Sequence, residues 1–242
     1  MINDENRIKN EIDHGAKIKD YAENVWNWNT HAGKIRWERR VRLLSAHLNP
    51  KMCVLEIGCG TGLLTKELQN SNADVNAIDI SPDLLNIAKK RINSKNIKFK
   101  LDNAYDLSFD DESFDTVIGS SILHHLNIKK ALVEFYRVLK PGGTIYFTEP
   151  NMLNPIIAIQ KNIPFIKKLM GDTPDETAFI KWKIISLLKK HKFKNIKVTS
   201  FDFLHPSLPK FSLPIMIPFT NFLEKFPLIS EIAGSLYIKS KK

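Results

Sequence analysis

One stretch determines the architecture expected of this chain: Val54-Leu55-Glu56-Ile57-Gly58-Cys59-Gly60-Thr61-Gly62. Residues 54–57 form a short, largely apolar run, which is typical of a buried parallel strand. Glycines then stand at every second position, so a backbone without side-chain bulk can lie close to a ligand. A helical pattern resumes over residues 63–69 and places the N–H groups of a helix N-terminus beside that ligand. The stretch thus predicts a strand, a ligand-binding turn and a helix.

Two acidic residues indicate which ligand this turn binds. Glu56, at the end of the strand, would repel a pyrophosphate and attract an ammonium group. Asp79 ends the next apolar run and can accept hydrogen bonds from the hydroxyls of a ribose. The spacing G-x-G-x-G differs from the G-x-G-x-x-G of nicotinamide-dinucleotide sites, which argues against an NAD-dependent dehydrogenase. S-adenosylmethionine has both an amino-acid part and a nucleoside part, so it is the ligand that these two carboxylates indicate.

Strand and helix patterns alternate along the middle of the chain. The periodicity predicts strands at 53–57, 74–79, 97–101, 114–119 and 143–149, and helices at 62–70, 82–93 and 128–139. Such alternation indicates a parallel, doubly wound α/β sheet. Ser81 and Pro82 suit the start of the second helix, and Pro141-Gly142-Gly143 is expected to end the third.

The flanking segments follow other patterns. Residues 5–48 are expected to be helical, with Thr30 as the cap of a helix that starts at His31. Beyond Glu149 we expect short helices within 150–171, a helix over 177–191, and strands over 196–203 and 235–238. An insert with five prolines, residues 204–230, separates these last two strands.

Three further segments accompany the glycine stretch, at residues 98–107, 113–126 and 137–147. In order and spacing, the four segments resemble the class I S-adenosylmethionine-dependent methyltransferases, in the group that includes the quinone-biosynthesis methyltransferases. The resemblance is close over 50–150. It implies a Rossmann-like, seven-stranded sheet, mostly parallel, with an antiparallel pair at the C-terminal edge. It also implies a single domain over 1–242, made of an N-terminal helical cap (1–49), a cofactor-binding core (50–150) and a C-terminal part with substrate-side insertions (151–242).

The resemblance assigns roles around the cofactor, S-adenosyl-L-methionine. Glu56 would engage its amino group, Asp79 the ribose, and Ile80 the adenine ring; capping of a helix is the alternative role for Asp79. The adenine amino group would meet either Asp102 or Asn103, since relatives more often carry Asp at the second position. The remaining expected contacts are Gly58, Cys59, Gly60 and Gly62 in the turn, Ala104 beside the adenine, and Ser120 after the fourth strand.

Methyl transfer from a sulfonium requires alignment of donor and acceptor, and sometimes removal of a proton. His125 is the first candidate for a general base, ahead of His124, because a histidine pKa lies near neutrality. Packing of one histidine and solvation of the other is the alternative. Glu149, at the end of the fifth strand, is the second candidate base or else a hydrogen-bonding cap. The spacing of histidines and acidic residues predicts no metal site.

The C-terminal part differs from the rest in charge. Residues 151–242 hold 15 lysines and 6 acidic residues, a net charge of +9 out of +10 for the chain. Attraction to a membrane, a phospholipid or a nucleic acid is one explanation, and compositional drift is the favoured one. His205 and the apolar segment 211–226 are expected to form the distal wall of the acceptor pocket, or a small second core. Trp26, Trp28 and Trp37 would line that pocket or simply pack.

The leading functional prediction is an enzyme that methylates a small molecule or lipid, at oxygen. An RNA or other nucleic-acid methyltransferase is the alternative, although Ser120-Ser121-Ile122 replaces the Asp/Asn-Pro-Pro-aromatic loop of enzymes that act on base nitrogens. A non-catalytic module that binds S-adenosylmethionine is a third. The two cysteines, Cys53 and Cys59, are expected to stay reduced, and no secretory signal is recognised near the N-terminus, so a cytoplasmic location is expected, with peripheral membrane contact as an option.

Overall fold

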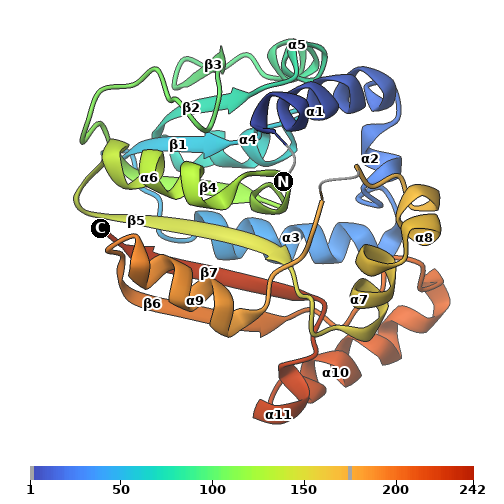
Figure 1. The fold of residues 1–242 in the computed structure, drawn as a ribbon. Coiled ribbons are helices and arrows are strands. Elements are labelled where there is room, and N and C mark those ends of the chain that lie inside the picture. The colour runs from blue at the N-terminus through green and yellow to red at the C-terminus, as the bar shows by residue number, and fades with distance from the viewer. Residues whose placement is uncertain (1–2, 174–175) are drawn as a thin grey trace.

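A computed structural model describes residues 3–173 and 176–242 of the chain. Residues 1–2 of the expected N-terminal cap and 174–175 of the expected C-terminal part lie outside the described residues. The described residues form one seven-stranded sheet of order β3-β2-β1-β4-β5-β7-β6 (Figure 1). Its strands are β1 Cys53–Ile57, β2 Asp74–Asp79, β3 Ile97–Leu101, β4 Phe114–Ser120, β5 Leu139–Pro150, β6 Lys194–Phe201 and β7 Ser235–Lys241.

Strand directions confirm the predicted sheet. The five strands β1 to β5 are parallel, and β7 lies antiparallel between β5 and β6. Glu56 of β1 stands opposite Ala77 of β2 on one side and Ile118 of β4 on the other. The order of the strands reverses between β1 and β4, and ligands of doubly wound sheets bind at the carboxyl ends of strands beside such a reversal. The glycine turn follows β1 at that point.

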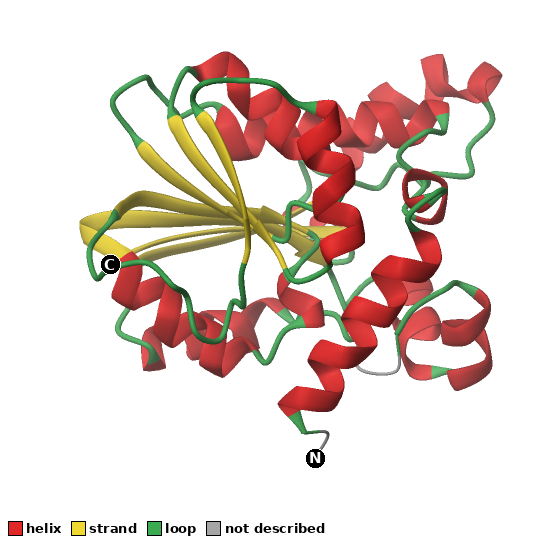
Figure 2. Ribbon diagram, turned by 90° about the horizontal axis from the view of Figure 1, so that it is seen from above, coloured by secondary structure: helices red, strands yellow, loops and turns green. Residues whose placement is uncertain are grey.

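Helices cover both sides of the sheet, as Figure 2 shows. On one side, Leu132 of α6 and Ile184 of α9 belong to a core with the inner strands. On the other side, Leu44 of α3, Leu68 of α4 and Leu85 of α5 belong to a second core. The helices are α1 Asp4–Ile18, α2 Ala22–Val25, α3 His31–Ser45, α4 Leu63–Leu68, α5 Pro82–Arg91, α6 Ile128–Val138, α7 Pro155–Asn162, α8 Pro164–Leu169, α9 Lys181–Lys190, α10 Leu213–Leu223 and α11 Pro227–Ser230.

The two predicted N-caps are present, whereas the helix expected to end at Pro141-Gly142-Gly143 ends at Val138 and those three residues belong to β5. Thr30 Oγ1 accepts a hydrogen bond from the Gly33 N–H at 2.9 Å and so starts α3. Ser81 Oγ accepts from the Leu84 N–H at 3.4 Å at the start of α5. The helical region expected over 5–48 is divided into three helices, α1, α2 and α3.

Several predicted boundaries differ from the observed ones, and the two largest shifts are at the starts of β5 and α9. Strand β5 begins at Leu139 instead of residue 143, because Leu139 is fully buried and pairs with Phe114 of β4. The helix α9 begins at Lys181 instead of residue 177, because Phe179 is held in an extended segment by backbone hydrogen bonds to Pro150 and Met152. This second difference brings the residues just before Phe179 to the carboxyl end of β5.

Two insertions accompany the C-terminal strands. The helices α7 and α8 follow β5 and lie beyond its carboxyl end in Figure 1, while α10 and α11 lie between β6 and β7 in sequence. Among the described residues, the helices are too short or too polar to cross a bilayer. Residues of α1, α3 and α7 lie over the end of the sheet where the glycine turn lies.

Candidate functional site

A cavity of about 490 Å³ lies at the carboxyl ends of the strands. A second pocket of about 60 Å³ adjoins it, since both are lined by Gly58, Asp79, Ile80 and His125. The larger cavity is roofed by residues of α1, α3 and α7 as well as by the chain after β6. Its volume is in the range of small-molecule sites.

The glycine turn forms the floor of the larger cavity. Gly58 and Gly60 have φ angles of 65° and 53°, a conformation that favours glycine. A Cβ atom on Gly58 would lie 2.4 Å from Cδ1 of Ile122, so a side chain there would displace the loop after β4. Gly62 starts α4 and lies against Ala88, and it does not line the cavity. Thus Gly58, Cys59 and Gly60 present the turn to a ligand.

Asp79 holds this turn in place. Its Oδ2 accepts a hydrogen bond from the Gly60 N–H at 2.7 Å, and its Oδ1 accepts from the Ser81 N–H at 2.8 Å. Burial raises the pKa of the Asp79 carboxyl, and the two backbone hydrogen bonds oppose that rise. Asp79 therefore links β2, the glycine turn and the start of α5, in addition to lining both pockets.

Glu56 carries a buried carboxyl group whose hydrogen bonds are incomplete. Its side chain is 1% exposed, and among the described residues its Oε2 has no hydrogen-bond partner. Burial raises the pKa of Glu56 to about 8. Burying a hydrogen-bond acceptor without a donor costs free energy. Glu56 lines the cavity, so a bound ligand could supply the missing donor. The amino group of S-adenosylmethionine carries the charge and the donors that would complete it.

The residues expected around adenine line the smaller pocket. Asp102, Asn103 and Ala104 are all found there, with Asp79 and Ile80. Asp102 Oδ2 accepts hydrogen bonds from Ser108 at 2.6 Å and 3.2 Å, and Asn103 Oδ1 accepts from the Tyr105 N–H at 3.0 Å. Both side chains therefore also fold the loop between β3 and β4.

Glu149 and the two histidines meet at the ends of β4 and β5. Glu149 Oε1 accepts hydrogen bonds from the N–H groups of Ile122 and Leu123, and Oε2 lies 2.7 Å from Nδ1 of His124. Glu149 is 1% exposed and does not line the cavity, whereas His124 and Ser120 do. Glu149 thus caps the turn Leu123–His125 and orients the His124 ring.

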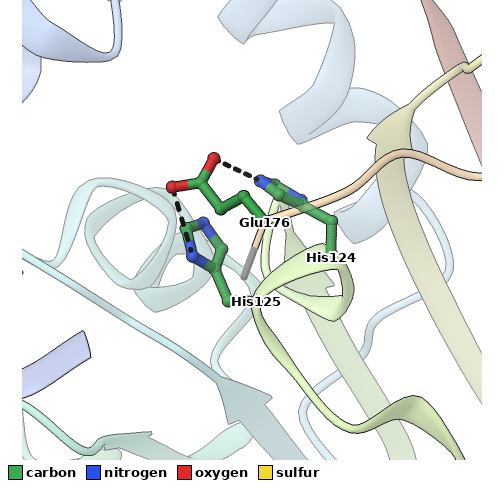
Figure 3. A group of neighbouring side chains, drawn as sticks. All are labelled: His124, His125 and Glu176. Atoms are coloured by element: carbon green, nitrogen blue, oxygen red, sulfur yellow. Dashed lines mark ion pairs between the residues drawn. The ribbon is translucent and has the colours of Figure 1, made fainter. Parts of the chain in front are cut away.

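Two glutamates that the sequence analysis missed complete this cluster. His125 Nδ1 lies 3.0 Å from Glu11 of α1 and 3.7 Å from Glu176, and His124 Nε2 lies 3.9 Å from Glu176. Figure 3 shows the Glu176 carboxylate between the two imidazole rings. Lys161 of α7 lies 2.7 Å from the same carboxylate. No local sequence pattern marks Glu11 or Glu176, because their partners are distant along the chain.

The carboxylates give the two histidines different charges. Burial disfavours the protonated form of His125, but Glu11 and Glu176 outweigh it and raise its pKa to about 9. Burial and the charge of His125 lower the pKa of His124, against the influence of Glu149. Burial alone would raise the pKa of Glu176, but the positive charges of His125 and Lys161 hold that pKa well below its usual range. Near neutral pH, His125 is therefore cationic and His124 is neutral.

The same cluster bears on the expectation of no metal site. His124, His125 and Glu176 each offer one ligand atom, and these atoms lie within 4.8 Å of one another, so among the described residues they form a candidate cation site. However, Glu176 is already paired with Lys161 at 2.7 Å and with the protonated His125. A metal ion would have to compete with both side chains, and we identify none of the three as a metal ligand.

Three tryptophans also line the cavity, and Trp26 is the one that lies against the glycine turn. The positions of Trp26, Trp28 and Trp37 match one of the two interpretations of their sequence. Behind them, Arg40 is 3% exposed and bonds Asp202 at 2.8 Å. This pair fixes α3 to the end of β6.

The expected distal wall was only partly right. His205, Pro206 and Ser207 line the cavity, but no residue of the segment 211–226 does. Phe211 is 84% exposed, and the apolar side chains of α10 that are buried face α3 instead. The segment therefore presents part of its apolar surface outward.

Comparison with known sequences places the chain in a family. The family described as "Methyltransferase domain" matches residues 55–147. The demethylmenaquinone methyltransferase of Lactobacillus johnsonii is 32% identical over 171 residues, covering 61% of this chain and 70% of the relative. The demethylmenaquinone methyltransferase of Chlorobaculum tepidum is 27% identical over 250 residues, covering 97% and 92%. An uncharacterized protein of Methanocaldococcus jannaschii is 33% identical over 191 residues, covering 76% and 83%.

Solved structures show the same fold. A methyltransferase of Thermotoga maritima, described as a possible histamine N-methyltransferase, superposes with a TM-score of 0.70 at 20% identity, covering 93% of this chain and 98% of its own. Phosphoethanolamine N-methyltransferase 2 of Haemonchus contortus, solved with S-adenosylhomocysteine, superposes with a TM-score of 0.67 at 17% identity, covering 96% and 60%. Together with the matched sequences, these likenesses mean that the chain belongs to the class I S-adenosylmethionine-dependent methyltransferases and is an enzyme that uses S-adenosyl-L-methionine as its methyl donor.

Proposed function

We propose that this enzyme methylates a hydroxyl group of a small-molecule or lipid acceptor that is held within the cavity. One observation carries the proposal: the cavity of about 490 Å³ runs without interruption from Glu56 and Asp79 to Trp28 and His205. A donor bound at the first end would have its reactive methyl group inside the same cavity as the acceptor. Relatives named demethylmenaquinone methyltransferase support an acceptor of small-molecule size.

Four groups of residues would hold the donor. Glu56 would accept hydrogen bonds from the amino group, and the backbone of residues 58–60 would lie under the methionine part. Asp79 would accept from the ribose, and residues 102–104 would contact the adenine in the smaller pocket. When bound, S-adenosylmethionine supplies a sulfonium methyl group that needs alignment with a nucleophile more than it needs activation.

His124 is the best-supported group for removing the acceptor's proton. Its Nδ1 is held by Glu149 at 2.7 Å, which leaves Nε2, 3.9 Å from Glu176, as the nitrogen that would accept a proton. Its lowered pKa keeps it neutral near pH 7, as a general base must be. His125 was the base that the sequence favoured. The negative charges of Glu11 and Glu176 keep its ring protonated near pH 7, so it cannot accept a further proton. Glu149 would then act as a positioning residue.

The test is transfer of a labelled methyl group from S-adenosylmethionine to separated metabolite, lipid and RNA fractions. The proposal expects label in a metabolite or lipid fraction, at a site that alkaline ester hydrolysis or ether analysis identifies as oxygen. Glu56→Gln serves as the control with weakened donor binding. Label in RNA alone would favour the nucleic-acid alternative, and no label in any fraction would favour a binding module.

A further inference from the structure

The helices α10 and α11 carry an apolar surface that faces away from the cavity and the core. Phe211, Ile215 and Leu228 are 84%, 74% and 89% exposed, and the phenylalanines between them are about half exposed. Within α10, Ile215, Phe219 and Phe222 recur every three or four residues, which places them on one face of the helix, and Phe211 and Phe226 continue this spacing beyond its two ends. We call this surface the outer stripe: Phe211, Ile215, Phe219, Phe222, Phe226 and Leu228.

The outer stripe is not required to hold the helix in place. The opposite face of α10 supplies Leu213, Met216 and Ile217 to a small core with Ala32 of α3 and with Leu204. That core anchors α10 to the body of the enzyme. The protein therefore does not need the outer stripe in order to fold. A contiguous exposed apolar surface of this kind marks an interaction site.

The charged residues around the outer stripe indicate which partner it binds. The thirteen residues 211–223 contain no charged side chain, and exposed lysines, Lys210 and Lys225, stand at the two ends. The nearby acidic residues are turned to other partners: Glu224 bonds Arg39 at 2.7 Å, and Glu231 bonds Lys181. An apolar helix face flanked by lysines is the pattern of a helix that lies in the interface of an anionic bilayer.

We propose that the outer stripe docks this enzyme on the surface of an anionic lipid bilayer. A second copy of the chain fits less well, because a two-fold contact through the stripe would bring the lysines of both copies together. A bilayer with anionic lipids offers both an apolar interior and a negative rim. The net charge of +9 on residues 151–242 adds attraction at longer range.

The docking surface is also close to the cavity along the chain. His205, Pro206 and Ser207 line the cavity, and the stripe begins four residues later at Phe211. The same stretch of chain therefore joins the cavity wall to the docking surface. Docking itself is independent of which acceptor is methylated.

The experiment measures binding of the full chain to vesicles of phosphatidylcholine, with and without phosphatidylglycerol, by co-sedimentation. Phe211→Ser with Leu228→Ser should weaken binding to the anionic vesicles by about tenfold or more, since both side chains lose their buried apolar area. The matched control is Val133→Ser with Trp182→Ser, because these side chains are 56% and 58% exposed on other helices. The control should bind like the unmodified chain.

A second pair of variants tests the charge. Lys210→Gln with Lys225→Gln should reduce binding to anionic vesicles about fivefold per lysine and leave binding to neutral vesicles unchanged. Unchanged calorimetric binding of S-adenosylhomocysteine verifies that each variant is folded. No vesicle binding, or equal losses in the control pair, would overturn the proposal. So would a dimer in sedimentation velocity that the Phe211 and Leu228 substitutions dissociate, because the occupant would then be a second copy.

Discussion

The donor end and the acceptor end of the cavity are built in different ways. The donor end consists of the turn 58–60 and of Asp79, which lie on adjacent strands and are joined by one short hydrogen bond. The acceptor end, together with the histidine cluster that also borders the smaller pocket, is assembled from separate elements: Glu11 of α1 meets His125, and Arg40 of α3 meets Asp202. A local motif thus forms the expected donor end, and long-range contacts form the rest of the site.

The largest expected effect separates the two histidines of the acceptor end. His124→Gln should lower kcat by about 10²–10⁴-fold, because a glutamine can keep a hydrogen bond to Glu149 but cannot accept a proton. Donor affinity should not change. The measurement is single-turnover methyl transfer with an acceptor that the labelling experiment identifies.

The control is His125→Gln, which should retain more activity. The pH profile adds a second criterion: since the pKa of His124 lies below its ordinary value of 6.5, wild-type activity should fall only as the pH drops below about 6.5. A larger loss in His125→Gln than in His124→Gln would reverse the assignment.

The next effect concerns the donor end. Asp79→Asn should weaken binding of S-adenosylhomocysteine by about 3 kcal/mol, because one amide oxygen cannot replace two carboxylate oxygens toward Gly60, Ser81 and the ribose. Asp83→Asn is the matched control, since Asp83 forms only a half-exposed ion pair with Lys19. Calorimetry that finds equal affinities for the two variants would remove Asp79 from the donor site.

A smaller effect tests the contact between Glu11 of α1 and His125. The pKa of His125 is about 9 in the folded enzyme and about 6.5 when unfolded, so its stabilising contribution is complete below pH 6.5 and is lost as the pH rises through 9. Glu11→Gln should flatten this pH dependence, by on the order of 1–2 kcal/mol in the free energy of unfolding. Denaturant titrations at several pH values measure it. Parallel curves for variant and wild type would mean that Glu11 does not set the charge of His125.

The smallest effect tests a link between the start of α3 and the loop after β6. Thr30 Oγ1 caps α3 and also donates to the Pro206 carbonyl at 2.9 Å. Thr30→Ala should lower the free energy of unfolding by about 1 kcal/mol, and Thr30→Ser should restore most of it. Thermal unfolding of both variants compares them. A serine variant as unstable as the alanine variant would show that the hydroxyl is not the cause.

The same comparison explains what could be predicted from the sequence. The strands, the glycine turn and the caps at Thr30 and Ser81 depend on neighbouring residues, so their patterns are visible locally. The start of α9 was missed because Phe179 takes part in hydrogen bonds with the end of β5, a contact that outweighs helix propensity.

The acceptor end could not be predicted for the same reason. Glu11 and Glu176 reach His125 only after the chain has folded, and nothing next to them in sequence marks them. The outward face of the segment 211–226 was mistaken for a cavity wall because hydropathy alone does not indicate which way an apolar helix faces. The roles proposed for Asp79, Asn103 and Ser120 toward the donor remain predictions.

The central claim is that Glu56 receives the ammonium group of the donor, and calorimetry in buffers of different ionisation enthalpy tests it most directly. With a pKa of about 8, Glu56 is mostly protonated at pH 7 in the free enzyme. Binding of S-adenosylhomocysteine should therefore release up to about one proton from the wild type and none from Glu56→Gln, which should bind at least about 100-fold more weakly. Equal affinity and equal proton release in the two proteins would contradict the account.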